Sequence, residues 1–181
     1  MQIIPIVLTS SFLSSVLTSA INWLIQKNNY KNEYYKKILD RRLDAYENVE
    51  TLIASMKVLI HSESGQLCND FCSFGKSKFD GYMNSIVLVI TKSLWLNPEI
   101  SNLLSEYNVF LLQNIEYKID KNINCDDELE RLGILNRDKI QDFRHKIENL
   151  LYKDLKNLHK IKAFFAQKRD LSKILINLKE T

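Results

Sequence analysis

Cysteine, histidine and clustered acidic residues are the side chains of this chain best able to do nucleophilic, redox or metal chemistry. Cys68 and Cys72 are four residues apart, a spacing that puts two side chains on one face of a helix, and Cys125 stands alone. Three histidines show no metal-ligand spacing to these cysteines: His61, His145 and His159. We therefore interpret the cysteines as small apolar core residues, and their odd number suits a reducing compartment.

An acidic cluster is the other group of side chains that could do chemistry. The cluster consists of Asp126, Asp127, Glu128 and Glu130, and it lacks the turn glycine of a calcium loop. We interpret these acids as the beginning of a short helix that ends near Gly133. The chain also has no glycine-rich phosphate loop, no paired-histidine motif and no nucleophile elbow. We expect no catalytic site, no metal site and no cofactor.

Charge is distributed very unevenly at the beginning of the chain. The first 26 residues carry no charged side chain, and the next 16 carry eight. A helix over the 23 residues from Ile3 to Ile25 is about 34 Å long, slightly more than the hydrocarbon core of a bilayer. A cleaved signal peptide, a buried core helix and a helix lying flat on the membrane are the alternatives. The lack of basic residues before Lys27 or on a polar face favours a spanning helix over the first and third.

The residues that follow this span set its expected orientation. They form a basic collar that we expect to face lipid: Lys27, Lys31, Lys36, Lys37, Arg41 and Arg42. The positive-inside rule places this collar and the rest of the chain in the cytoplasm, with the amino terminus on the other side of the membrane. Trp23 is expected at headgroup depth.

Polar residues recur every three or four positions within the span. We call the following residues the polar stripe: Ser11, Ser15, Thr18, Ser19 and Asn22. Small and hydroxyl side chains at this spacing allow close helix contact and hydrogen bonds within a membrane. The stripe is either a polar face that the membrane merely tolerates or the contact surface of a dimer. Alternatively, it lines an aqueous path when several copies gather.

Glycine and proline are scarce, with four and two residues in 181, so long helices are expected after the anchor. We predict an all-α protein in which a transmembrane helix continues into an antiparallel cytoplasmic helical bundle. The predicted divisions are the anchor (1–26), the collar with a long helix ending near His61 (27–61), and the bundle (62–181). Residues 83–96 are read as a buried helix, with a second span as the alternative. Asn97 and Pro98 begin a helix that extends to Ile119.

The last predicted helix is capped by Asn136 and has a long apolar stripe. This stripe contains Ile140, Phe143, Ile147, Leu150, Leu151, Leu155, Leu158, Ile161 and Phe165. Basic residues gather along the same segment, and we consider them as a surface for a partner or nucleic acid: Lys153, Lys156, Lys160, Lys162, Lys168 and Arg169.

The segment after the span, residues 34–47, reads YYKKILDRRLDAYE. It resembles the juxtamembrane segment of small, singly anchored helical bacterial proteins, some of which are similar to the membrane effectors that accompany retron reverse transcriptases. The resemblance covers about the first 60 residues and carries no catalytic residue. It implies a toxin-like effector of anti-phage defence, held inactive by a protein or ribonucleoprotein partner and released on infection to permeabilise the inner membrane.

Three hypotheses about function remain open from the sequence. A membrane-damaging effector of abortive infection predicts toxic expression, self-association in lipid and a role for the polar stripe. A membrane tether or scaffold predicts harmless expression and a bundle that binds a cytosolic protein. A nucleic-acid-binding tether depends on the basic residues of the last helix.

Overall fold

The computed structural model describes residues 3–62, 65–119, 125–160 and 164–166, with side chains described from residue 18 onward. Helices dominate this part of the chain, as predicted. The chain divides into two compact units, Met1–Asp40 and Arg41–Thr181. The boundary therefore falls inside the predicted segment 27–61, and we describe each unit by itself.

The first unit contains the beginning of helix α1, which extends over Ile3–Lys57. The whole predicted span of residues 3–25 is helical. Uninterrupted helix fits a segment without glycine, in which Pro5 stands in the first turn, where its missing N–H group costs nothing.

The second unit begins with the last turns of α1, whose buried positions recur at three- and four-residue steps. These positions are Arg42, Ala45, Tyr46, Val49, Leu52, Ile53 and Met56. This spacing keeps one face of the helix against the core. The side-chain amides of Asn69 and Gln141 donate hydrogen bonds of 3.0 and 2.8 Å to the carbonyl of Met56. Both bonds satisfy a carbonyl that the end of α1 leaves without a helical partner.

A small hairpin follows α1, and its first strand replaces the end of the predicted long helix. α1 ends at Lys57 rather than His61, and strands β1 (Leu59–His61) and β2 (Leu67–Asn69) pair antiparallel with Ile60 opposite Cys68. Gly65 lies in the connection with φ of +76°, a left-handed conformation that glycine adopts without steric cost. The all-α prediction is thus correct for the architecture and wrong for this short segment.

Three helical elements then precede the predicted Asn97 cap. They are α2 (Asp70–Ser73), α3 (Lys76–Thr91) and the 3-10 turn η1 (Ser93–Trp95). The buried residues of α3 include Phe79, Tyr82 and Ile86. The predicted buried helix of residues 83–96 therefore begins seven residues earlier, at Lys76, and ends at Thr91.

Helix α4 (Pro98–Asn114) begins as the sequence predicted. The side chain of Asn97 accepts a 2.9 Å hydrogen bond from the backbone N–H of Glu99, and Pro98 occupies the first turn. The helix ends at Asn114 and is followed by the 3-10 turn η2 (Glu116–Lys118). A 2.7 Å hydrogen bond between the hydroxyls of Tyr82 and Tyr107 satisfies two buried polar groups between α3 and α4.

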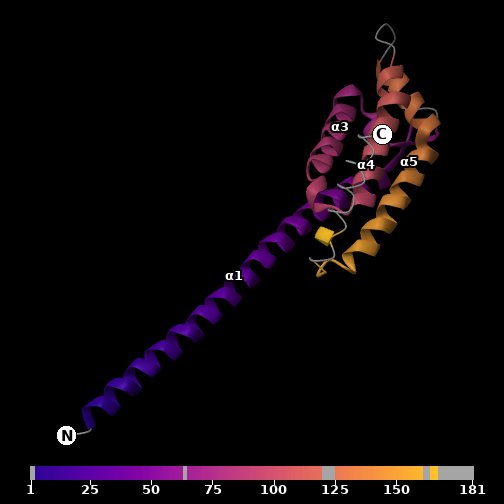
Figure 1. The fold of residues 1–181 in the computed structure, drawn as a ribbon. Helices are drawn as coiled ribbons and strands as arrows, with labels where there is room; N and C mark the ends of the chain where they lie inside the picture. Colours follow the sequence, from indigo (N-terminus) through magenta and orange to yellow (C-terminus); the bar gives the residue numbers. More distant parts are fainter. Residues whose placement is uncertain (1–2, 63–64, 120–124, 161–163, 167–181) are drawn as a thin grey trace, which may run out of the picture. The chain divides into compact units, whose positions relative to one another are not determined.

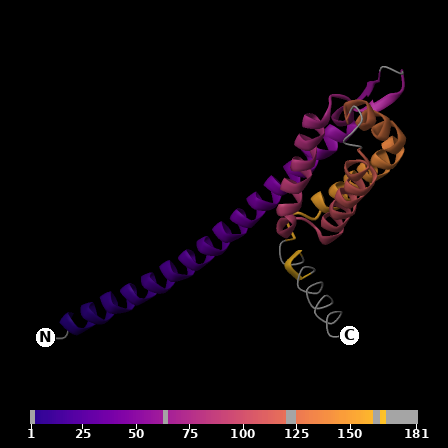
Figure 2. The same cartoon turned by 90° about the horizontal axis from the view of Figure 1, so that it is seen from above.

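Helix α5 (Cys125–Leu155) is continuous, whereas the sequence predicted a break at Gly133 and a new cap at Asn136. The acids Asp126, Asp127 and Glu128 do lie in its first turn, as predicted. Gly133 is a buried helical residue that packs on Cys68 and Cys72 rather than a helix end. α3, α4 and α5 lie side by side around the core of this unit (Figures 1 and 2).

Candidate functional site

The uncharged beginning of α1 is the first candidate site. Its described apolar side chains are strongly exposed: Ile21 (49%), Trp23 (59%), Leu24 (52%) and Ile25 (52%). In the polar stripe, Thr18, Ser19 and Asn22 are exposed, and the side chains of Ser11 and Ser15 lie outside the described residues. Within the part of the chain whose side chains are described, no helix is both long and apolar enough to cross a membrane. Side chains 1–17, most of the predicted span, are not in that part.

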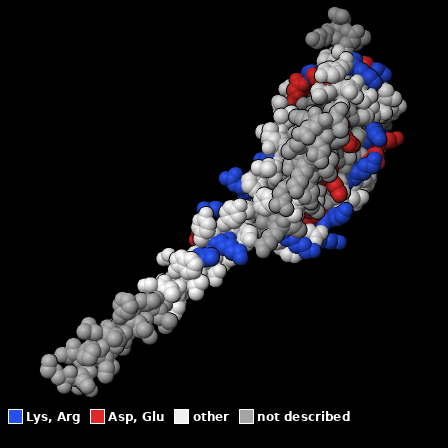
Figure 3. Space-filling model, viewed as in Figure 1, with Lys and Arg blue, Asp and Glu red and all other residues white. Residues whose placement is uncertain are grey.

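The first four residues of the basic collar are exposed on the same helix: Lys27, Lys31, Lys36 and Lys37. The ammonium of Lys27 lies 5.0 Å from the ring centroid of Trp23, and that of Lys31 lies 5.9 Å from the ring of Tyr35. Figure 3 shows the uncharged stretch of α1 giving way to basic side chains further along the helix. Aromatic rings next to lysines are typical of the membrane–water interface.

Arg41 and Arg42 belong to the second unit, and they differ in their exposure to solvent. Arg41 is exposed and lies 5.5 Å from the ring centroid of Trp95. Arg42 is only 1% exposed, so the prediction that it faces lipid is wrong. Its helical position is on the buried face of α1, one turn before Tyr46, which turns the side chain into the bundle.

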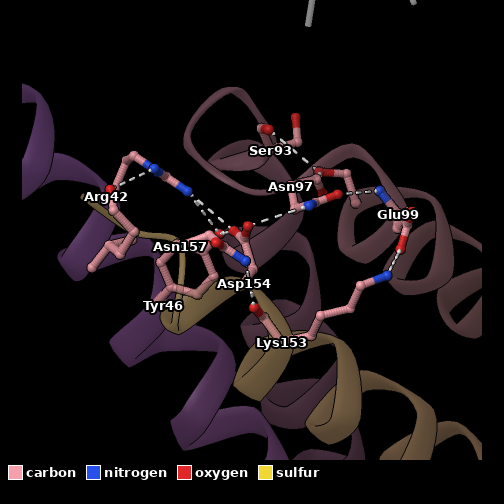
Figure 4. A network of polar contacts seen from close by, with 10 residues as sticks. Arg42, Tyr46, Ser93, Asn97, Glu99, Lys153, Asp154 and Asn157 are labelled. Atoms are coloured by element: carbon pink, nitrogen blue, oxygen red, sulfur yellow. Dashed lines mark hydrogen bonds and ion pairs between the residues drawn. The ribbon is translucent and has the colours of Figure 1, made fainter. Parts of the chain in front are cut away.

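The buried guanidinium of Arg42 is the centre of a polar network between α1 and the end of α5 (Figure 4). It forms a 3.1 Å ion pair with Asp154 and donates a 3.0 Å hydrogen bond to the carbonyl of Leu158. The hydroxyl of Tyr46 donates to the same Asp154 oxygen, and the amide of Asn97 lies 3.4 Å from the other one. Asp154 thus accepts from three donors of the protein itself.

Burial dominates the electrostatics of this pair. Loss of water raises the pKa of Asp154 above its ordinary value, an effect that the charge and hydrogen bond of Arg42 oppose. Burial likewise lowers the pKa of Arg42, against the attraction of Asp154. The centroid of the Phe164 ring lies 3.9 Å from the guanidinium carbon of Arg42, and the ring shields the guanidinium further. Each charge is tolerated only because the other is present.

A cavity of about 300 Å³ opens beside this pair. Its lining comes from α1, the beginning of α4 with its Asn97 cap, the end of α5 and the residues that follow α5. It includes Arg42, Asn97, Glu99, Lys153, Asp154, Asn157, Lys160 and Phe164. Lys153 bridges to Glu99 at 3.7 Å across the mouth. The Nε of Arg42 has no hydrogen-bond partner in the part of the chain that the structure describes.

The basic residues predicted as a partner surface divide into two groups. Lys153, Lys156 and Lys160 are exposed at the end of α5 and after it. Of these, Lys153 and Lys160 line the cavity and Lys156 does not. Lys162, Lys168 and Arg169 lie outside the described residues.

Cys68 and Cys72 are fully buried, as the interpretation of them as core residues predicted. They lie on β2 and α2 rather than on one helix. A hydrogen bond from Cys72 lowers the pKa of Cys68 to about 7, and the same bond raises the pKa of Cys72. Over the described ranges, histidine, cysteine and acidic side chains form no group able to hold a metal ion.

The sequence did contain a signal for the Arg42–Asp154 pair that we missed. Arg42 continues the core spacing of α1, and Asp154 continues that of α5, seven residues after Ile147 and four before Leu158. We assigned the apolar stripe to Leu155, which is exposed. A cation and an anion that each occupy a core position of a helix predict a buried pair.

Comparison of the chain with protein-family models, with curated proteins and with solved structures finds no match.

Proposed function

We propose that the beginning of α1 anchors this protein in a bacterial inner membrane, and that the protein is an effector that perturbs this membrane. The observation that carries the proposal is an uncharged helical segment whose exposed apolar side chains end at exposed lysines. A helix satisfies its own backbone hydrogen bonds, so lipid can cover its apolar side chains without exposing polar groups. Lysines next to Trp23 then suit the headgroup layer on the cytoplasmic side.

The polar stripe supports an action on the membrane beyond anchoring. An anchor that only holds a protein in lipid gains nothing from the hydroxyl and amide side chains of the stripe. In a bilayer such groups hydrogen-bond across helix contacts, at about 0.6–2 kcal/mol each, and small residues allow helices to approach closely. Self-association of several copies along this face would place polar groups around a path through the membrane. The resemblance to retron-associated effectors points to anti-phage defence, with a partner holding the effector inactive.

A tether is the second candidate, and the cavity beside Arg42 favours it. A membrane-bound bundle with a polar, basic-rimmed cavity could hold a cytosolic protein or nucleic-acid complex near the membrane. This candidate predicts that expression is harmless, whereas the effector predicts that expression alone depolarises cells.

Replacing Ser15, Thr18 and Asn22 together by leucine tests the effector proposal. The variant keeps the length of the segment and raises its hydrophobicity, so membrane localisation should persist while the polar contacts disappear. With induced expression and a membrane-potential dye, we expect the parent to depolarise cells and the variant to lose most of this effect. A matched control replaces Leu13, Leu17 and Leu24 by isoleucine, which changes three residues without removing a polar group, and should depolarise like the parent.

Two results would count against the effector. A harmless parent at high expression without any partner would favour the tether. Equal depolarisation by the parent and the leucine variant, with both in the membrane fraction, would show that the polar stripe is not the active face.

A further inference from the structure

We propose that the cavity beside Arg42 binds a phosphoryl group. Its size, about 300 Å³, suits a small phosphate ester or a single lipid headgroup. This inference goes beyond the proposed effector and does not depend on the anchor, because the second unit supplies the whole lining.

Within the part of the chain that the structure describes, the charged side chains of the lining leave one cation without a partner. Arg42 pairs with Asp154 at 3.1 Å, and Lys153 pairs with Glu99 at 3.7 Å. Lys160 forms no ion pair in the described part of the chain, so the five charged side chains of the lining leave a net charge of one positive. An anion would neutralise it. Lys153 is also available, because it and Glu99 are 72% and 61% exposed and their pair is readily exchanged.

The buried Arg42–Asp154 pair leaves a donor, and no acceptor, without a partner among the described residues. The carboxylate of Asp154 already accepts from Arg42, Tyr46 and Asn97. The Nε–H of Arg42 has no acceptor among the described residues, although the side chain is 1% exposed. A buried donor without a partner carries a free-energy cost that a ligand oxygen can remove. The net positive charge of the lining and the unpaired Nε–H of Arg42 among the described residues therefore favour an anion over a cation.

A phosphoryl group fits these donors better than a planar carboxylate. Its tetrahedral oxygens can accept from several directions at once, from the guanidinium of Arg42 and from the two lysines that line the cavity. The Phe164 ring at 3.9 Å excludes water from the guanidinium, which strengthens a charge-assisted hydrogen bond there. A soluble phosphate ester and the phosphate of a lipid headgroup share this chemistry.

The Nε–H resonance of Arg42, followed by NMR on the full chain in neutral detergent micelles, reports the proposed bond directly. In one arm the probes are inorganic phosphate and glycerol 3-phosphate. In the other arm phosphatidylglycerol is added to the micelles, with diacylglycerol as the phosphate-free comparison. We expect a shift of this resonance in at least one arm. A response to the soluble probes identifies a phosphate ester as the source, and a response to phosphatidylglycerol alone identifies a headgroup.

Lysine variants decide whether the response comes from this cavity. We expect Lys160→Gln and Lys153→Gln each to weaken binding by about three- to tenfold. Lys156→Gln is the matched control, since Lys156 is exposed between them in sequence and does not line the cavity, and it should change binding less than about twofold. An unchanged Arg42 resonance with every probe would overturn the proposal. Equal weakening by all three variants would overturn it as well, because it would indicate diffuse attraction to a basic surface.

Discussion

Arg42 and Asp154 are charged residues on core positions of two helices, and their mutual dependence leads to a prediction at the residue scale. Removing the carboxylate charge with Asp154→Asn leaves a buried guanidinium without its counterion. We expect the free energy of unfolding to fall by about 3 kcal/mol, the lower end for breaking a buried pair, because Asp154 is partly exposed. Replacing both residues, as Arg42→Met with Asp154→Leu, should cost less than the single change. Urea unfolding of the full chain in detergent measures both.

The matched control for this pair is Lys156→Gln, an exposed change two residues from Asp154 that we expect to alter stability by less than about 0.5 kcal/mol. If Asp154→Asn proved as harmless as this control, the pair would not hold α1 against the end of α5.

Gly133 is a buried glycine inside α5 that packs closely on two cysteines. In a helix interior, glycine to alanine usually stabilises by about 0.5–1 kcal/mol. At Gly133 a Cβ atom would lie 2.5 Å from the Cβ of Cys72 and 2.8 Å from the sulfur of Cys68, so we expect Gly133→Ala to destabilise by about 1–3 kcal/mol. Gly81→Ala is the control, because nothing lies within 4 Å of its Cβ position in α3. We expect thermal unfolding to show a lower melting temperature for Gly133→Ala and a higher one for Gly81→Ala. Equal stabilisation by the two changes would contradict the close packing at Gly133.

At the scale of elements, the ion pair of Lys57 with Glu148 connects the end of α1 to α5. The hydrogen bond from Lys57 lowers the pKa of Glu148 below its ordinary 4.5. The folded state therefore binds this proton less tightly than the unfolded state, so the stabilisation is present above the ordinary pKa and is lost as pH falls through the lowered one. We expect Glu148→Gln to cost up to about 1 kcal/mol at neutral pH and nothing at acidic pH below both values.

Denaturant unfolding at several pH values tests this dependence. Glu106→Gln, at an exposed position of α4 outside the ion pairs of the described residues, is the control and should change the free energy of unfolding by less than about 0.5 kcal/mol at neutral pH. A cost of Glu148→Gln that stayed constant down to low pH would mean that packing, rather than charge, accounts for it.

Some features of the helices and strands could be predicted from the sequence, and others could not. The Asn97–Pro98 start of α4 was predicted correctly, because helix capping depends on neighbouring residues. The β1–β2 hairpin was missed because three-residue strands are too short to show an alternating pattern. Gly133 was misread because a glycine that allows close packing and a glycine that ends a helix look alike until the partner, here Cys72, is known.

For the candidate site, the sequence predicted types of residue but not all of their partners. Arg42 was assigned to the collar by its neighbours along the chain, whereas its position on the α1 face puts it in the core with Asp154, 112 residues away. Such a pair depends on how two helices meet, and local charge counts contain no information about that.

At the scale of the whole molecule, we propose that the beginning of α1 crosses the membrane with the basic collar in the cytoplasm. Orientation should depend on the exposed collar residues, so replacing Lys27, Lys31, Lys36, Lys37 and Arg41 by glutamine is expected to yield mixed orientations. Arg42 is left unchanged in this variant, because its replacement would disturb the core instead.

A reporter that fluoresces only in the cytoplasm, fused after Thr181 and followed through an alkaline wash of the membranes, tests the span and its orientation together. We expect the parent fusion to remain in the washed membrane fraction and to be fluorescent, and the glutamine variant to remain there with reduced fluorescence. Release of the parent by the wash would contradict the span. A retained parent that is dark, with a periplasmic reporter active in its place, would contradict the orientation.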